Sequence, residues 1–326
     1  MLMKRRDFIA LLGGIAANWP LAIRAQEAGR TYRLGTLSLS QRKDPAPIAF
    51  YKGLKQYGFI EGQNLLADPN GYGLRMEQFA DHAAEIVKSR VDVIVCSGDP
   101  AIRAAQQATN TIPILGSTED MLGSGFVRSL AKPEGNITGH SILSTELNGK
   151  RQEILMEILP GVRHIAALAE AGTYSLHRLQ PLHDLSRARG VELSIYRVSK
   201  LEEITDAVDA AKESGAGALN VLASPFSYAY RQIIRDAAAA RSLPAIYQFP
   251  EMAEEGGLIA YGSSIVAIWR DLASRQLAAL LRGAKVADVP IEQPTTFDLV
   301  INLKTAKALG LKISESFLLR ADDVIE

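Results

Sequence analysis

Two hydrophobic periods alternate along most of the chain. Short apolar runs such as residues 91–96 (VDVIVC) are typical of buried strands, and apolar residues three and four apart, as over residues 76–87, are typical of amphipathic helices. Because strand and helix patterns follow one another repeatedly, the chain predicts parallel sheets covered by helices on both faces. The expected strands lie at residues 32–39, 64–67, 91–96, 112–115, 164–168, 191–198, 218–222, 245–249 and 258–261.

The strand-helix units fall into two sets of similar size. Between the sets, residues 131–139 (AKPEGNITG) are rich in turn formers and lack periodicity, which suits a chain that crosses between lobes. Glycines at 256–257 and 262 suit a return crossing, and Val289-Pro290 suits a third. We therefore predict two doubly wound α/β lobes with a hinge and a cleft between them. Residues 26–142 plus about 264–290 form the first lobe, and residues 143–263 plus about 291–326 form the second.

Residues 1–25 have the pattern of an export signal. Arg5 and Arg6 precede an apolar run over residues 8–17, and small residues follow as far as Ala25, the expected cleavage site. Ten apolar residues span about 15 Å as a helix, roughly half of a bilayer core, so we expect no stable membrane anchor. The arginine pair indicates twin-arginine export to a Gram-negative periplasm, with general secretory export as the alternative.

Composition removes several classes of function. Lys and Arg number 36 and so do Asp and Glu, so no net positive field exists to recruit nucleic acid. Cys96 is the one cysteine of the chain and the five histidines are scattered, which argues against disulfides and zinc sites. The sequence contains no G-x-S-x-G, Walker or G-x-G-x-x-G motif in a suitable context. We expect no cofactor, no metal, no catalytic site and no enzymatic activity.

Ligand-binding residues are expected in the loops that follow the strands. Ligands of open parallel sheets bind beyond the carboxyl ends of the strands, where helix N-termini carry partial positive charge. Ser97-Gly98-Asp99-Pro100 is the strongest candidate, because Gly98 lets a ligand approach the backbone and Pro100 suits a first helical turn. Asp99 either caps that helix or contacts a ligand amine, and the sequence leaves both possibilities open.

Aromatic residues in the second half of the chain are expected to stack on a flat or apolar ligand. Phe226 is the first choice, since Pro225 precedes it and serines flank the pair in a loop after a strand. Core filling is the alternative for any single ring. The complete set of expected ligand-binding residues is Ser38, Ser97, Gly98, Asp99, Ser117, Thr118, Glu119, Tyr174, Ser224, Phe226 and Gln248.

Several segments carry a family resemblance over nearly the whole chain after residue 25. They are residues 58–64, 91–95, 129–139, 243–247, 297–311 and 318–325. On these segments the chain resembles the ABC transporter substrate-binding protein family that includes the tryptophan-binding TrpX-like proteins. The resemblance implies a type I periplasmic-binding-protein-like fold and a monomer that closes on a small solute. It also implies delivery to an ABC permease driven by a separate ATPase.

Two positions depart from the family pattern at the expected cleft. Asp99 stands where family members often have a hydroxyl residue, and Glu119-Asp120-Met121 stands where they often have Gly-Asp-Pro. Because most of the matching residues belong to the scaffold, the resemblance does not specify the cargo. We expect a small organic solute, such as an amino acid or an aromatic or other carboxylate.

Other classes of protein share this architecture. A periplasmic ligand sensor for a receptor kinase would use the same closed form, and an exported two-lobe transferase or hydrolase would turn its ligand over. A ligand-responsive DNA regulator needs a helix-turn-helix module, and the export signal occupies that place in the chain. We therefore expect an ABC importer's periplasmic solute-binding component, with no nucleic-acid partner.

Overall fold

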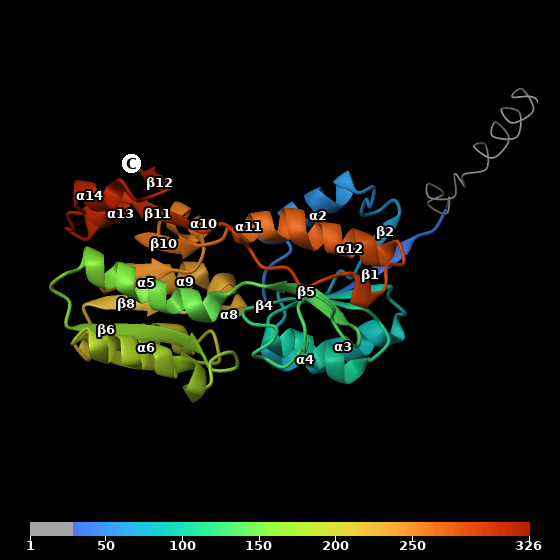
Figure 1. The fold of residues 1–326 in the computed structure, drawn as a ribbon, viewed down its shortest axis with the longest axis horizontal. Helices are drawn as coiled ribbons and strands as arrows, with labels where there is room; N and C mark the ends of the chain where they lie inside the picture. Colours follow the sequence, from blue (N-terminus) through green and yellow to red (C-terminus); the bar gives the residue numbers. More distant parts are fainter. Residues whose placement is uncertain (1–28) are drawn as a thin grey trace, which may run out of the picture. The chain divides into compact units, whose positions relative to one another are not determined.

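Two β-sheets, each with helices on both faces, make up residues 32–326 (Figure 1). The computed structural model describes residues 29–326 and, within them, every side chain other than those of residues 144–146. The predicted export signal, residues 1–25, lies outside the described residues. The prediction of two α/β lobes built on parallel sheets is confirmed.

The first lobe contains a five-stranded parallel sheet with the strand order β2-β1-β3-β4-β5. Its alternating side chains feed two cores. Ile94 and Cys96 pack under α3 and α4, whereas Val93 and Val95 pack under α2 and α12, as expected for a period of two in a sheet that is buried on both faces. The strands are β1 (Tyr32–Leu37), β2 (Leu65–Ala67), β3 (Val93–Ser97), β4 (Ile114–Thr118) and β5 (Ile137–Ser141), and the helices are α2 (Pro45–Gln56), η1 (Met76–Gln78), α3 (Phe79–Lys88) and α4 (Asp99–Ala108).

The second lobe contains a seven-stranded sheet with the order β12-β11-β10-β9-β8-β6-β7. All neighbours run parallel except β10 and β11, so the expectation of a purely parallel sheet is wrong for this pair. Helices α5 and α6 cover one face, and α7, α9 and α10 cover the other. The strands are β6 (His164–Glu170), β7 (Glu192–Val198), β8 (Ala218–Val221), β9 (Ala245–Tyr247), β10 (Ile259–Gly262), β11 (Asp298–Asn302) and β12 (Asp323–Ile325). The helices are α5 (Ser144–Ile158), α6 (Leu176–Ala188), α7 (Glu203–Glu213), α8 (Pro225–Ala229), α9 (Arg231–Ala240), α10 (Pro250–Glu254), α13 (Leu303–Ala308) and α14 (Glu315–Leu318).

The predicted linker over residues 131–139 ends inside a strand rather than in a crossing. Strand β5 pairs parallel to β4, and the chain leaves the first sheet after Ser141. Gly139 made the segment look like a loop in the sequence, but in the structure this glycine allows β5 to pack closely against β4. A Cβ at Gly139 would lie 1.8 Å from the carbonyl oxygen of Gly116 on β4. Only glycine fits this approach of the two strands.

The chain crosses between the sheets twice more. After Gly262 it enters α11 (Ile265–Ala267), the π-helical segment η2 (Ile268–Ala273) and α12 (Ser274–Leu281), and this helical run packs on α2 of the first lobe (Figure 1). After η3 (Val286–Asp288) the amide of Glu292 still donates to the carbonyl of Gly139 at 3.0 Å. The last crossing therefore lies between Glu292 and β11, slightly later than the predicted Val289-Pro290.

Gln276 on α12 ties the crossing segments together. Its amide nitrogen donates to the carbonyl oxygens of Gly139 and Pro290, each at 3.0 Å, and its Oε1 lies 3.1 Å from Nδ1 of His140. Both Gln276 and His140 are buried. Because three separate stretches of chain meet at one side chain, the base of the hinge is held in a single arrangement.

Two helical glycines should respond oppositely to alanine. A Cβ at Gly53 on α2 would lie 2.1 Å from the carbonyl oxygen of Arg270, so Gly53→Ala is expected to reduce the free energy of unfolding by about 1–3 kcal/mol. A Cβ at Gly149 on α5 has Leu185 as its nearest neighbour at 3.9 Å, so Gly149→Ala is expected to add about 0.5–1 kcal/mol. Urea unfolding of both variants checks this, and equal effects of the two substitutions would contradict it.

Candidate functional site

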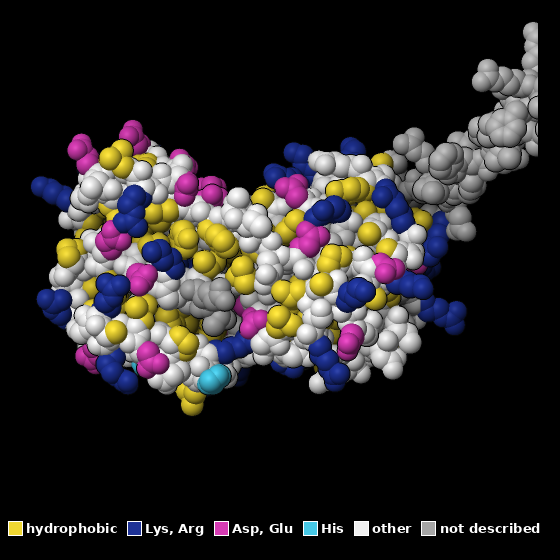
Figure 2. Space-filling model, in the orientation of Figure 1, with side chains coloured by type: hydrophobic (Ala, Val, Ile, Leu, Met, Phe, Trp, Pro, Cys, Tyr) yellow, Lys and Arg dark blue, Asp and Glu magenta, His cyan; other side chains and the backbone are white. Residues whose placement is uncertain are grey.

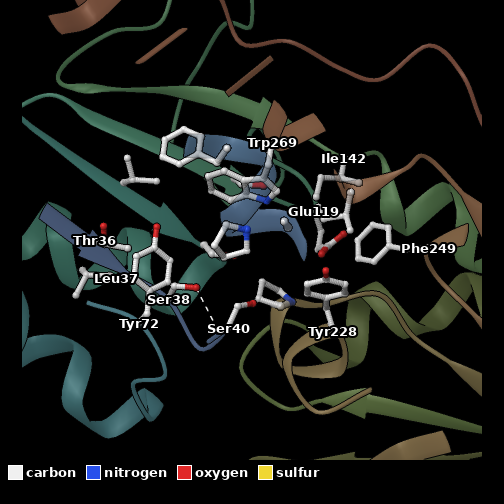
Figure 3. Close-up of a pocket in the computed structure, with 18 residues that line it drawn as sticks. Thr36, Leu37, Ser38, Ser40, Tyr72, Glu119, Ile142, Tyr228, Phe249 and Trp269 are labelled. Atoms are coloured by element: carbon white, nitrogen blue, oxygen red, sulfur yellow. Dashed lines mark hydrogen bonds between the residues drawn. The ribbon is translucent and has the colours of Figure 1, made fainter. Parts of the chain in front are cut away.

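A cavity lies between the carboxyl ends of the strands of the two sheets (Figure 3). The first lobe contributes the ends of β1, β3 and β4, the second contributes α8 and the residue before α10, and the crossing segments contribute Ile142 and Trp269. The empty volume is about 560 Å³, part of which opens to solvent. A cavity at the boundary of two lobes, lined mostly by apolar side chains with a few polar groups, is typical of sites that bind small organic molecules.

Aromatic rings from both lobes form the cavity walls. Phe50 and Trp269 lie edge to face with ring centroids 5.4 Å apart, and Tyr228 and Phe249 do so at 5.6 Å. Tyr72 lies at the opposite end (Figure 3). Since these rings stand on two stretches of each lobe and on one crossing segment, a flat or apolar ligand would be enclosed from several sides.

Polar side chains line the floor on the first-lobe side. Thr36, Ser38, Ser97 and Ser117 stand at or just beyond the ends of β1, β3 and β4, where parallel strands bring their last residues to one edge. Glu119 follows β4 and is 2% exposed. Its carboxylate and the hydroxyl of Tyr228 point toward one another from opposite lobes (Figure 3). The 18 residues drawn there include no Lys, Arg or His.

The predicted ligand-binding residues separate into three groups. Those that line the cavity are Ser38, Ser97, Ser117 and Glu119. Those of the first lobe that lie in the boundary between the lobes instead are Gly98, Asp99 and Thr118. Those packed inside the second lobe are Tyr174, Ser224, Phe226 and Gln248.

Phe226 was predicted to contact the ligand, but its side chain does not line the cavity. Its ring is 1% exposed and lies edge to face on Tyr230 at 4.8 Å. The loop after β8 is in fact the first turn of α8, in which Ser224 caps the helix by accepting a hydrogen bond from the amide of Ser227. That turn directs Phe226 into the lobe and Tyr228 toward the cavity.

Asp99 joins the two lobes rather than capping its helix. Gly98 occupies the N-cap position of α4 with a φ of 92°, and no side-chain cap bond forms. The Asp99 carboxylate accepts hydrogen bonds from Thr118 and, at 2.6 Å, from Ser124. Arg178 of the second lobe approaches it to 3.8 Å and donates to Ser124 at 2.8 Å. Asp99 therefore pairs with a charged side chain of the other lobe instead of accepting hydrogen bonds from the first backbone amides of α4.

Arg178 is a residue that the sequence analysis did not single out. It lies in the first turn of α6, where the helix dipole disfavours a cation. That local conflict is the signal that could have identified it. A second arginine, Arg231 at the start of α9, lies 3.8 Å from Asp44, the N-cap residue of α2 in the other lobe. With Arg178 also 3.9 Å from Asp120, three ion pairs thus connect the lobes.

Glu170 at the end of β6 is a buried acid beside this boundary. It is 1% exposed, and burial raises its pKa to about 7, with a further upward contribution from Asp99. A Cβ at the neighbouring Gly172 would lie 3.4 Å from Oε1 of Glu170 and 3.6 Å from Pro100 of the first lobe. Glu170 therefore lies near the boundary with the first lobe, close enough for Asp99 to affect its pKa.

Gly98 is required for the two lobes to approach. Beyond its positive φ, a Cβ at this position would lie 2.6 Å from Cγ of Pro225 in the second lobe. Gly98→Ala is expected to weaken ligand binding at least tenfold, because the added methyl group holds the lobes apart. Gly62 is the matched control, with a φ of 79° and nothing within 4 Å of its Cβ position, so Gly62→Ala imposes similar backbone strain without a contact. Equal ligand affinities of the two variants, measured by calorimetry, would contradict this role.

Other kinds of site find no support among residues 29–326. No group of three or more His, Cys, Asp or Glu side chains in this range is arranged to hold a metal ion. In the same part of the chain, no helix has the length and apolarity needed to cross a membrane. Lys, Arg, Asp and Glu are interspersed over the face that Figure 2 shows, without a large patch of one sign.

Comparisons with known proteins point to one family. The family model described as "ABC transporter substrate binding protein" matches residues 45–325. A tyrosine-binding protein of Clostridioides difficile is 26% identical over 275 residues, which cover 82% of this chain and 77% of that protein.

Solved structures share the fold over almost the whole described chain. A conserved domain protein of Vibrio cholerae has a TM-score of 0.80 at 26% identity, covering 90% of this chain and 100% of that one. An ABC domain of Streptococcus pneumoniae in complex with L-Trp has a TM-score of 0.77 at 23% identity, with the same coverage. The two lobes therefore have a type I periplasmic-binding-protein-like fold.

Proposed function

Since the chain belongs to the ABC transporter substrate-binding protein family, we propose that it captures a small organic solute between its lobes and delivers it to an ABC permease with a separate ATPase. Proteins of this family are typically extracellular or periplasmic. We propose a Gram-negative periplasm as the location, with residues 1–25 as a twin-arginine export signal and Ala25 as the last residue removed.

The observation that carries this proposal is the cavity enclosed from both lobes. Tyr228 and Phe249 of the second lobe, Phe50 of the first lobe and Trp269 of a crossing segment all line this space. Outside the cavity, Arg178 and Asp99 connect the lobes. A solute that contacts both walls binds the closed arrangement better than an open one, and this difference in affinity drives closure.

The cargo that we propose is an aromatic amino acid or a closely related aromatic solute. The rings of the cavity offer faces and edges for stacking, the hydroxyls of Ser38, Ser97 and Ser117 offer hydrogen bonds to a carboxylate, and Glu119 offers an acceptor for an amine. The tyrosine-binding relative supports this choice. Other aromatic carboxylates fit the rings and hydroxyls but carry no amine that could donate to Glu119.

We propose binding without turnover. The cavity presents serine and threonine hydroxyls, but the lining residues include no histidine or lysine that would activate one of them as a nucleophile. Glu119 is the one acidic side chain in the lining. A solute released from the closed form should therefore be chemically unchanged.

A thermal-shift screen tests the proposal. The mature protein, unfolded and refolded to remove any carried ligand, is mixed with the twenty amino acids, aromatic acids, aromatic amines and two sugars. Aromatic amino acids are expected to raise the melting temperature by several degrees, because ligand binding stabilises only the folded form. Mass spectrometry of the recovered ligand should show no new product. A shift with sugars alone, or conversion of the ligand, would refute the proposed function.

A further inference from the structure

One end of the cavity is built from two polar groups that belong to different lobes. Glu119 follows β4, and Tyr228 lies on α8 with 4% of its surface exposed. The hydroxyl of Tyr228 has no hydrogen-bond partner among the described residues, and it points into the cavity toward the Glu119 carboxylate (Figure 3). Buried hydroxyls in proteins normally have a hydrogen-bond partner, so we expect a group of the ligand to bind this one.

The chemistry of this end favours a hydrogen-bond donor with a positive charge. An ionised carboxylate only accepts hydrogen bonds, whereas a phenol hydroxyl donates or accepts. A protonated amino group donates to both. A ligand carboxylate in the same place would lie against the carboxylate of Glu119, and the lining itself has no Lys, Arg or His that could donate to it.

Arg151 lies close to Glu119 in the same buried region. This guanidinium on α5 is itself buried and donates to the carbonyl of Tyr261 at 2.9 Å and to Asn148 at 2.6 Å. It lies close enough to Glu119 for the two charges to interact. Arg151 is not among the residues that line the cavity, so it supports the carboxylate from outside while Glu119 presents the polar surface.

Aromatic rings also stand at this end. Figure 3 shows Phe249 and the ring of Tyr228 beside the carboxylate of Glu119, and the guanidinium of Arg231 already lies over the Tyr228 ring at 4.5 Å from its centroid. The faces of such rings attract a cation, and the attraction is stronger where water is excluded. The carboxylate, the phenol oxygen and the rings thus all favour the same kind of ligand group.

We propose that the cavity selects its solute by a protonated amino group bound between Glu119 and Tyr228, so that aromatic amines without a carboxylate are also ligands of this protein. This inference rests on the proposed function and narrows its ligand class. It assigns Glu119 and Tyr228 as the residues that determine specificity.

Two matched series of compounds test the inference by calorimetry at pH 7. They are tyrosine, tyramine and 3-(4-hydroxyphenyl)propionate, and tryptophan, tryptamine and indole-3-propionate. In the series that binds, the amine is expected to bind within about tenfold of the amino acid. The propionate, which keeps the ring and the carboxylate but lacks the nitrogen, is expected to bind at least 100-fold more weakly.

Two variants show whether the named residues act on the nitrogen. Glu119→Gln is expected to weaken the amino acid and the amine at least 30-fold and to leave the propionate unchanged or slightly improved. Tyr228→Phe keeps the ring and is expected to weaken the amine about fivefold to tenfold. Glu61→Gln, on the surface of the first lobe, is the control. Melting temperatures show whether each variant is folded. If Glu119→Gln does not fold, the affinities of Tyr228→Phe alone decide the test.

The outcomes separate the inference from the proposed function. If a propionate binds as tightly as its amino acid while the amine does not bind, the inference is overturned and an aromatic cargo stands. Equal losses for all three compounds in Glu119→Gln would also overturn it, because they would indicate a structural role. If none of the six compounds binds, the proposed cargo and the inference fall together.

Discussion

Raising the pH from 5 to 8 should weaken ligand binding by about twofold to fivefold, because closure of the lobes brings Asp99 toward Glu170 and favours the protonated form of Glu170. Burial raises the pKa of this carboxyl from 4.5 to about 7, and Asp99 contributes to the rise. When the lobes separate, Asp99 moves away, whereas the second-lobe groups around the carboxyl, including Ser224 and Thr173, stay in place, so only the part of the rise that is due to Asp99 is lost. Closure therefore takes up a fraction of a proton below about pH 7, and the affinity falls as the pH rises toward 7 and is constant above it.

The variant Glu170→Gln shows whether the pH dependence of ligand affinity comes from Glu170 or from another titrating group. The amide has the size of the carboxyl but no charge, so the variant should bind equally well at pH 5 and pH 8 and more tightly than the natural protein at pH 8. Calorimetry with the same aromatic ligand at several pH values gives both curves. An affinity of the natural protein that rises with pH over this range would contradict the assignment.

The ion pair between Arg178 and Asp99 is expected to stabilise the closed form specifically. Asp99 is 5% exposed, and the Arg178 side chain is 16% exposed. Arg178→Met removes the guanidinium that approaches this carboxylate from the other lobe and should weaken ligand binding about 10- to 100-fold, in line with the loss of a largely buried charge pair. The melting temperature without ligand should change little, because each lobe keeps its own core.

A double-mutant cycle isolates the pair. Asp99→Asn keeps the bonds from Thr118 and Ser124 possible while removing the charge, and adding Arg178→Met to it should produce little further loss. Arg128 and Glu134, which are 3.9 Å apart and mostly exposed, form the control pair, and Arg128→Met should leave affinity unchanged. Additive losses for Arg178 and Asp99 would show that the two residues act independently.

The fold was predictable because hydrophobic period and length are local properties. Residues 91–96 and 76–87 predicted a buried strand and an amphipathic helix, and β3 and α3 occupy these places. Two features needed information from distant parts of the chain. The antiparallel direction of β11 depends on where the chain re-enters the second lobe, and β5 was obscured by Gly139, whose role is set by the backbone of β4.

The site was predictable on one side. The rule that ligands bind beyond the ends of parallel strands identified Ser38, Ser97, Ser117 and Glu119, which line the cavity. The opposite wall was missed, since Trp269 stands on a helical crossing segment and its neighbours in space are far away in sequence. Phe226 and Tyr228 differ by two positions and are both buried, and only the helical turn of α8 determines which of them lines the cavity.

The first lobe is completed by α12, a helix that follows most of the second lobe in the sequence, so the order of synthesis affects how this lobe folds. One face of the first sheet is covered by α12 as well as α2, with Leu277 and Leu281 packing on Val93 and Val95. A nascent chain that has emerged only through β5 would expose those valines to water. The first lobe therefore reaches its native core only after most of the second lobe has been synthesised, and the two halves must mature together rather than one after the other.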